Sequence, residues 1–372
     1  MSNSMPPRRP TVAVIGGGYG GVAVAKKLDD VADVVLVEPK ESFEHSIAGL
    51  RALVDPSWLT KVYLPYDNLL THGRVVRDHA VAVESGRVVL GSGQEIAADY
   101  IVLATGSRYP FPGKAGVFDT EAAHELYRIS HEALATADRV LLLGSGPVGI
   151  ELAGEIKEVW PDKKVTIAEL GDDILPGPFM PELRVALRRH LDELGVELLF
   201  GGQLSEEPPV EPGTAKTFGV ATKDGGEFTA DIWFRCYGVT PVTGYLTGDL
   251  APARTPGNRI DVTAEMRVTG GKNVFAVGDI VARDSPMAGR AGMQAEVVAG
   301  NIRAAITGEG EQVAYVPMPP VIAVPIGPRR GAGQLPGVEG VVEGETIAEI
   351  KGRDLMVGRL AETLGLPEAA TR

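Results

Sequence analysis

Cysteine is almost absent from this 372-residue sequence, which contains Cys236 alone. One cysteine cannot form a disulfide within the chain, a CxxC redox pair or a cysteine-rich metal site, and we expect no metal centre. Cys236 ends an apolar run, which favours a small buried residue. The alternative is a redox-active thiol that cycles through a sulfenic acid.

Basic charge is also scarce, because 36 Lys and Arg residues stand against 49 Asp and Glu residues. The formal net charge of −13 opposes binding to phosphate backbones and to anionic lipid surfaces. We therefore expect no nucleic-acid partner and no electrostatic attachment to a membrane.

Long apolar runs are missing as well, since no stretch approaches the roughly 20 apolar residues of a membrane-spanning helix. The stretch 1–10 lacks the apolar segment of a signal peptide, and Ser2 stands where N-myristoylation requires glycine. We expect a cytoplasmic protein, monomer or homodimer, with at most weak peripheral contact at the inner face of a membrane. The leucines of 355–366 favour core packing or a dimer contact over an amphipathic membrane helix.

Glycine, in contrast, is abundant, with 47 residues, and two glycine-rich stretches share the pattern GxGxxG. Gly16–Gly21 follows the apolar run Thr11–Ile15, and Gly144–Gly149 follows Arg139–Leu143. Each apolar run is typical of a strand, and each glycine turn opens a helical stretch. The candidate binding residues at these turns are Gly16, Gly18, Tyr19, Gly20 and Gly21 in the first and Gly144, Gly146, Pro147, Val148 and Gly149 in the second.

An acidic residue completes each unit, Glu38 in the first and Glu169 in the second. In a dinucleotide-binding βαβ unit the glycines allow a tight turn, close approach of a pyrophosphate and packing of helix on strand, while the acid binds ribose hydroxyls. For Glu38 the alternative is an ordinary acid at a strand end. Two complete units favour a protein that binds a flavin and a nicotinamide dinucleotide and passes a hydride between them.

Three further strand ends carry candidate cofactor residues. The apolar run Tyr100–Leu103 ends in Ala-Thr-Gly, which contains Thr105 and Gly106, and 230–235 ends at Gly238 in the equivalent place. The run 273–277 ends in Gly278 and Asp279; this acid is expected at the ribityl or pyrophosphate part of FAD, or else caps the following helix. Val81, in the expected strand Ala80–Glu84, is also a candidate.

The order of elements predicts an α/β fold with two Rossmann-like dinucleotide-binding domains of the glutathione-reductase-like type. We predict a discontinuous FAD-binding domain at 11–115 and 245–312, with an NAD(P)H-binding domain at 116–244 inserted in it. A small C-terminal α+β region, 313–372, is expected on the acceptor side or at an interface, with strand-like stretches at Val321–Pro325 and Glu345–Ile350. Val321–Ile326 is expected to form an apolar wall and Gly327–Gly333 a turn.

The order GxGxxG, Ala-Thr-Gly, GxGxxG, Val-Gly-Asp resembles the two-dinucleotide flavoprotein reductases, which include type II NADH dehydrogenases. Four stretches are similar to the ferroptosis suppressor and apoptosis-inducing factor-like family, namely 42–52 (SFEHSIAGLRA), 104–114 (ATGSRYPFPGK), 149–157 (GIELAGEIK) and 351–355 (KGRDL). This resemblance implies tightly bound, non-covalent FAD, NAD(P)H as the donor and a quinone as the acceptor.

The same resemblance implies roles for three charged residues. Arg51 would face the flavin, unless it is a surface arginine; His45 nearby is interpreted as structural. Glu151 would lie near the nicotinamide, unless it only gains from the dipole of its helix. Lys351 would face the flavin or the acceptor, unless it is a solvated lysine. Glu151 and Lys351 are the catalytic candidates.

Glu169 also bears on the choice of donor, because a carboxylate bonds the free ribose diol and repels a 2′-phosphate. Asp172 and Asp173 follow, and no arginine occurs in the next ten residues, so NADH is favoured over NADPH. The sequence thus predicts an FAD-dependent NADH:quinone oxidoreductase. The alternatives are a reductase of a small redox protein of the ferredoxin or rubredoxin type, which would need a basic docking surface, and a redox-sensing nucleotide-binding protein with little turnover.

Overall fold

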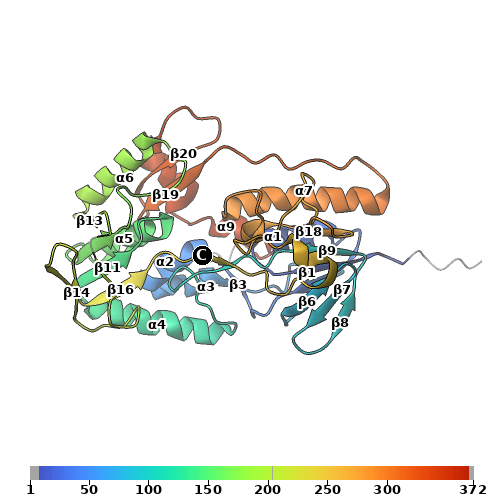
Figure 1. Ribbon diagram of the computed structural model, residues 1–372, viewed down its shortest axis with the longest axis horizontal. Coiled ribbons are helices and arrows are strands. Elements are labelled where there is room, and N and C mark those ends of the chain that lie inside the picture. The colour runs from blue at the N-terminus through green and yellow to red at the C-terminus, as the bar shows by residue number, and fades with distance from the viewer. Residues whose placement is uncertain (1–7, 203, 368–372) are drawn as a thin grey trace, which may run out of the picture.

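The computed structural model describes residues 8–202 and 204–367, and Figure 1 shows two parallel sheets with helices packed on them. The first sheet has five strands in the order β18-β9-β1-β2-β5, and every neighbouring pair is parallel. Its strands are β1 (Thr11–Ile15), β2 (Asp33–Val37), β5 (Arg74–Val76), β9 (Tyr100–Leu103) and β18 (Val274–Ala276). The strand β18 therefore joins the sheet from a distant part of the chain.

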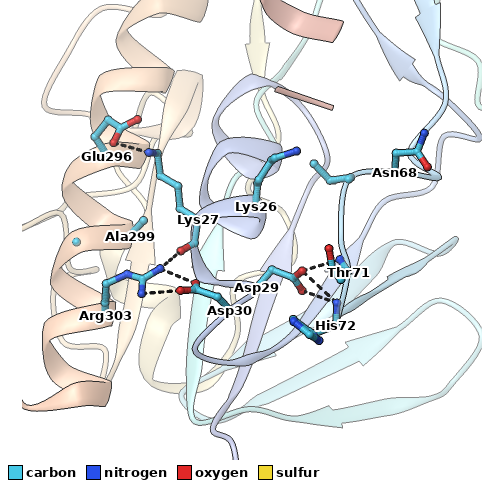
Figure 2. Close-up of a pocket in the computed structure, with 12 residues that line it drawn as sticks. Lys26, Lys27, Asp29, Asp30, Asn68, Thr71, His72, Glu296, Ala299 and Arg303 are labelled. Atoms are coloured by element: carbon cyan, nitrogen blue, oxygen red, sulfur yellow. Dashed lines mark hydrogen bonds and ion pairs between the residues drawn. The ribbon is translucent and has the colours of Figure 1, made fainter. Parts of the chain in front are cut away.

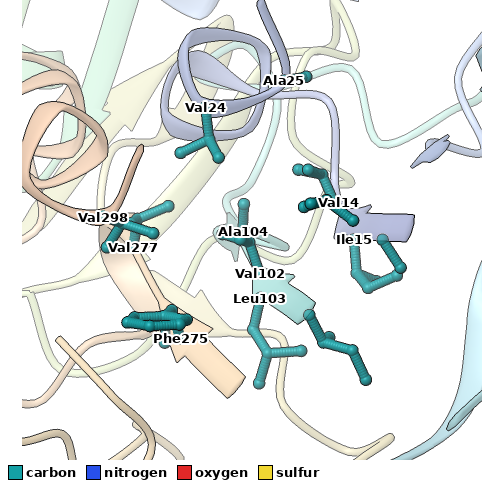
Figure 3. Packing of buried hydrophobic residues seen from close by; sticks show 14 of the residues in the cluster. Val14, Ile15, Val24, Ala25, Val102, Leu103, Ala104, Phe275, Val277 and Val298 are labelled. Carbon is teal, nitrogen blue, oxygen red and sulfur yellow. The ribbon is translucent and has the colours of Figure 1, made fainter. Parts of the chain in front are cut away.

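Helices α1 (Tyr19–Leu28) and α7 (Ala288–Thr307) pack together over this sheet. Figure 3 shows Val14 of β1 and Val102 of β9 in one cluster with Val24 of α1 and Val298 of α7. Strands covered on both faces are expected to be continuously apolar rather than alternating. The sequence runs of β1 and β9 meet that expectation, which is why both strands could be predicted with their observed bounds.

The second sheet has four parallel strands in the order β13-β12-β11-β16. Its strands are β11 (Arg139–Leu143), β12 (Lys164–Ala168), β13 (Glu197–Leu199) and β16 (Ile232–Arg235), and its helices are α4 (Thr120–Thr136), α5 (Pro147–Val159) and α6 (Pro181–Glu193). Leu183, Leu187 and Leu191 of α6 are fully buried, as their helical spacing predicts. The predicted α/β class, with two parallel sheets covered by helices, is confirmed.

Shorter elements connect and flank the two sheets. They are β3 (Phe43–Glu44) with β4 (Tyr63–Leu64), the meander β6 (Ala80–Glu84), β7 (Arg87–Leu90) and β8 (Glu95–Ala97), β10 (Ser107–Arg108) with β17 (Thr240–Pro241), and β14 (Phe218–Ala221) with β15 (Glu227–Ala230). Helical segments are α2 (Ser46–Val54), η1 (Pro56–Trp58), α3 (Leu59–Val62), η2 (Gly248–Ala253) and η3 (Gly278–Ile280). The chain passes between the two sheets twice, and the antiparallel pair β10–β17 joins these two crossing segments.

The C-terminal part corrects two predictions. The stretch 345–350 is helical rather than strand-like, because α8 (Glu345–Ile347) and a π-helical turn η4 (Ala348–Gly352) occupy it. Helical winding buries Ile347 completely against the bare backbone of Gly333. The stretch 327–333 is a turn only at its start, since β20 (Arg330–Gln334) pairs with β19 (Ile322–Ile326), and β21 (Val342–Glu343) pairs with β20.

The expected apolar wall in β19 is also wrong, because Val324 and Ile326 are buried in the core beneath α5. The final helix α9 (Val357–Thr363) buries Leu360 in the core of the first sheet, and Leu364, its C-cap, is buried there too. Core packing is thus the role of these leucines. Among residues 8–202 and 204–367, no helix combines the length and the apolar character needed to cross a bilayer.

Candidate functional site

Both glycine turns have the same backbone geometry. Gly16 and Gly144 have φ values of +106° and +104°, in the left-handed region that favours glycine. A Cβ atom on Gly21 would overlap the carbonyl of Gly16, and one on Gly149 would overlap that of Gly144. The first and last glycines of each fingerprint therefore serve a tight turn and close packing, as predicted.

The middle glycines, Gly18 and Gly146, face open space instead, and a Cβ atom on either would meet nothing within 4 Å. Each is the N-cap of its helix, α1 or α5, and neither provides a side-chain cap to the first N–H groups. Uncapped N–H groups at a helix N-terminus bind phosphate. Tyr19 and Gly20 open α1, and Pro147 and Val148 open α5, so both turns fit a dinucleotide pyrophosphate.

The two acids also occupy equivalent places. Glu38 Oε2 accepts a hydrogen bond from Gly17 N at 2.5 Å, and Glu169 Oε2 accepts from Ser145 N at 2.9 Å and Ser145 Oγ at 2.7 Å. Partial burial opposes ionisation of Glu169, but the hydrogen bonds from Ser145 and Gly171 outweigh it and lower the pKa. Glu169 is therefore a carboxylate at neutral pH, beside the second turn.

The other strand-end candidates gather around the first turn and the crossing between the sheets. Asp279 Oδ2 accepts from Ser107 Oγ at 2.6 Å, and Thr105 Oγ1 donates to the Val242 carbonyl at 2.6 Å. Gly106, Gly238 and Gly278 all have positive φ values, of +61°, +101° and +82°. Val81 lies in β6 of the meander, and 47% of its surface is exposed.

Two lysines that sequence reasoning missed lie beside these residues. Lys114 Nζ donates to Ser107 O at 2.6 Å and so contacts the same residue that donates to Asp279. Lys40 Nζ pairs with Glu44 at 2.6 Å. Burial lowers the pKa of Lys114, while Asp279 opposes that shift. The sequence signal for Lys114 is its position at the end of the stretch 104–114, one of the four stretches that carry the family resemblance.

The two catalytic candidates form an ion pair. Lys351 Nζ in η4 lies 2.7 Å from Glu151 Oε1 in the first half of α5. The side chains are 16% and 9% exposed, so water screens the pair little. Burial raises the pKa of Glu151, and the attraction of Lys351 counteracts part of that rise.

Arg51 is buried and makes its hydrogen bonds within the protein. Its Nε and Nη2 donate to the two carboxylate oxygens of Glu155 at 2.9 Å and 2.7 Å. Further bonds reach the carbonyls of Gly352 at 2.7 Å and Arg353 at 2.9 Å. The surface alternative for Arg51 is thus wrong, and its contact with the flavin stays a prediction.

His45 is structural in a specific way. Its Nε2 lies 2.7 Å from the Leu355 carbonyl and its Nδ1 2.9 Å from the Tyr19 hydroxyl. Burial lowers the pKa of His45 to about 4, so the ring is neutral. A carbonyl only accepts, so Nε2 carries the proton and Nδ1 accepts from Tyr19.

Cys236 is buried at the end of β16, as expected, and burial raises the pKa of its thiol to about 12. The thiolate needed for redox chemistry is therefore not formed at neutral pH. The depression in Figure 2, about 550 Å³, lies elsewhere, at the C-terminal end of α1. The charged residues that line it pair with one another, Lys27 with Glu296 and Arg303 with Asp30. These ion pairs link the C-terminal end of α1 to α7.

Comparison with known proteins agrees with this geometry. The family model described as pyridine nucleotide-disulphide oxidoreductase matches residues 10–300. Ferroptosis suppressor protein 1 of Taeniopygia guttata is 31% identical over 362 residues, which cover 95% of this chain and 95% of that protein. The resemblance of the four quoted stretches is thereby confirmed.

Solved structures share the fold. The sulfide:quinone oxidoreductase of Aquifex aeolicus has a TM-score of 0.71 at 18% identity, covering 96% of this chain and 92% of that one. Putidaredoxin reductase, in its covalent complex with putidaredoxin, has a TM-score of 0.68 at 21% identity, covering 88% of this chain and 81% of that one. At these identities the likeness shows the fold alone.

Proposed function

We propose that this chain, which belongs to the pyridine nucleotide-disulphide oxidoreductase family of FAD-dependent NAD(P)H oxidoreductases, carries electrons from NADH through FAD to a quinone. The observation that carries the proposal is the pair of glycine turns, 16–21 and 144–149, one on each parallel sheet. Their first glycines, Gly16 and Gly144, have matching φ values. A protein with a single nucleotide substrate has no use for the second turn.

FAD would be held by the first turn. The open space over Gly18 would admit the pyrophosphate and Glu38 would bind the ribose. Asp279 and Lys114, which both contact Ser107, would line the continuation toward the flavin. On this proposal FAD belongs to the parts 11–115 and 245–312, NADH to 116–244, and the region from 313 onward flanks the acceptor. Lys40 and Lys114 would supply positive charge to the negatively charged cofactor.

NADH would be held by the second turn, with its pyrophosphate over Gly146. The ionised Glu169 would bond the ribose hydroxyls and repel a 2′-phosphate, which supports NADH as the donor. Glu151 lies two residues beyond the last glycine of that turn, in α5, and would face the nicotinamide end of the bound NADH. Its pairing with Lys351 holds both side chains in fixed positions at this end of α5.

The bound flavin would supply the electron chemistry, accepting a hydride from the nicotinamide and giving electrons to the acceptor. The chain itself supplies orientation, exclusion of water and charge. Lys351 would contribute a positive charge that favours an electron-rich ring, and its ion pair with Glu151 would keep that ammonium in place. Positioning accounts for the catalysis, so the hydride step requires no general base from the protein.

The quinone is supported by the sequence resemblance, whereas the reductase alternative requires a basic docking surface that a net charge of −13 disfavours. Steady-state assays with NADH and either a short-tailed quinone or an oxidised ferredoxin distinguish the two. Faster turnover with the quinone, in the absence of lipid, is the expected result. Faster turnover with the protein acceptor would replace the quinone in this proposal.

A further inference from the structure

The segment that carries Lys351 has an irregular backbone. After the π-helical turn η4, Leu355 and Met356 have φ values of +50° and +64°, which side-chain-bearing residues rarely adopt. At Gly352 a Cβ atom would lie 2.9 Å from the Pro328 carbonyl. A segment of this shape needs contacts from outside itself to stay in place.

Two side chains from the start and the middle of α2 provide those contacts. Arg51 donates to the carbonyls of Gly352 and Arg353 at 2.7 Å and 2.9 Å. His45, the N-cap of α2, donates to the Leu355 carbonyl at 2.7 Å. Three of the four residues that follow Lys351 therefore have their carbonyls hydrogen-bonded by side chains at α2.

Arg51 is itself held firmly. Its bidentate pair with Glu155 has both partners almost fully buried, with side chains 7% and 6% exposed. Its guanidinium also lies 4.7 Å from the centre of the Trp58 ring. A planar fork bound at four points has little freedom to move, and lysine cannot reproduce it.

The geometry connects this anchor to the catalytic candidates. Glu155 lies one helical turn after Glu151 on α5, and Lys351 directly precedes Gly352. Two ion pairs therefore run side by side, Glu155 to Arg51 and Glu151 to Lys351. We infer that Arg51 and His45 are positioning residues, which hold the segment 351–356 so that the Lys351 ammonium stays on Glu151. This inference rests on the proposed function for the role of Lys351 in the reaction.

A hydrogen-bonded path also links this anchor to the first phosphate turn. Tyr19, which directly follows Gly18, donates its hydroxyl proton to His45 Nδ1 at 2.9 Å, and the opposite ring nitrogen donates to Leu355. The His45 imidazole therefore connects the segment 351–356 to the first glycine turn, which is the proposed FAD site.

The main test compares Arg51→Lys with Arg329→Lys. Arg329 is a matched control, because it too joins the C-terminal part to α5, through an exposed pair with Glu158 at 2.6 Å. In the FAD-loaded protein, Arg51→Lys should slow flavin reduction by NADH about tenfold, since loss of placement costs rate. The slowing should be less than about twofold when Lys351 is already Met, because Arg51 acts through Lys351. Equal slowing in both backgrounds, or none in either, would overturn the inference, and Arg329→Lys should change neither rate.

A second measurement does not depend on the reaction. The unfolding midpoints of Glu151→Gln, Lys351→Met and the double variant, without cofactor, give the coupling between these two side chains. That coupling should be present with Arg51 and lost with Arg51→Lys; a coupling that persists would contradict positioning even if NADH proves not to be the donor. If Arg51→Lys does not fold, His45→Phe should weaken the coupling and His45→Gln, which keeps an N–H donor, should preserve it. Failure of NADH to reduce the native flavin would instead reject the proposed function.

Discussion

Glu151 and Lys351 are 200 positions apart in the sequence, yet Oε1 and Nζ lie 2.7 Å apart in the structure. Glu151 belongs to α5, the helix that follows the second glycine turn. Lys351 belongs to η4 in the C-terminal part of the chain. Neither side chain is well hydrated, so each depends on the other for its charge.

Lys351→Met should lower the free energy of unfolding at pH 7 by about 3 kcal/mol, because it leaves the buried Glu151 carboxylate without a partner. The folded state then keeps Glu151 protonated to a higher pH than the unfolded state does. Stability of this variant should therefore fall as the pH rises above the ordinary carboxyl pKa of 4.5. Urea unfolding from pH 4 to 8 measures the slope, and adding Glu151→Gln should abolish it; a flat profile in the single variant would show that the carboxylate finds other compensation.

His45 should contribute a pH dependence of the opposite sign. Its pKa falls from 6.5 to about 4 on folding, so the unfolded chain binds the proton between these values. The protein should lose about 3 kcal/mol from this group as the pH drops from 6.5 to 4. The difference in unfolding free energy between the native protein and His45→Gln, measured across that interval, isolates the contribution. Parallel pH profiles would mean that the imidazole is not buried neutral.

Glu169→Gln should raise the ratio of kcat/KM for NADPH to that for NADH by about tenfold, because it removes the charge that repels a 2′-phosphate. Asp172→Asn is the control, since Asp172 is an exposed acid on the same loop. The control should leave the ratio unchanged. An equal shift in both variants would attribute the donor preference to general charge rather than to Glu169.

Gly18→Ala and Gly21→Ala should fail in different ways. A methyl group at position 18 meets no protein atom, so stability should change by less than about 0.5 kcal/mol while FAD content drops, because the methyl group occupies the phosphate path. A methyl group at position 21 overlaps the Gly16 carbonyl and should cost about 2 kcal/mol or more. Flavin absorbance per protein and thermal unfolding measure the two effects. Full FAD occupancy in Gly18→Ala would place the phosphates elsewhere.

The sequence predicted what local physics determines. Strands such as Thr11–Ile15 are continuously apolar because both faces are buried, and the glycine turns follow from backbone sterics that any chain must satisfy. The stretch 345–350 was mispredicted because its β-branched residues suit a strand, whereas packing of Ile347 on Gly333 selects a helix.

The candidate site was harder to predict, because its contacts join distant positions. The pairing of Arg51 with Glu155 spans 104 residues, and the Lys114–Ser107–Asp279 chain depends on how the crossing folds back to the first sheet. No periodicity or spacing encodes such contacts. The resemblance pointed to Arg51, Glu151 and Lys351 as individual residues, and only the fold shows which of them touch.

The most direct test of the account is rapid anaerobic mixing of the purified protein with NADH while the flavin absorbance is followed. We predict one FAD per chain, bleaching of that flavin by a stoichiometric amount of NADH, and recovery of the absorbance when a short-tailed quinone is added. A protein that binds FAD at the first turn, yet keeps its oxidised flavin spectrum in the presence of excess NADH, would contradict it.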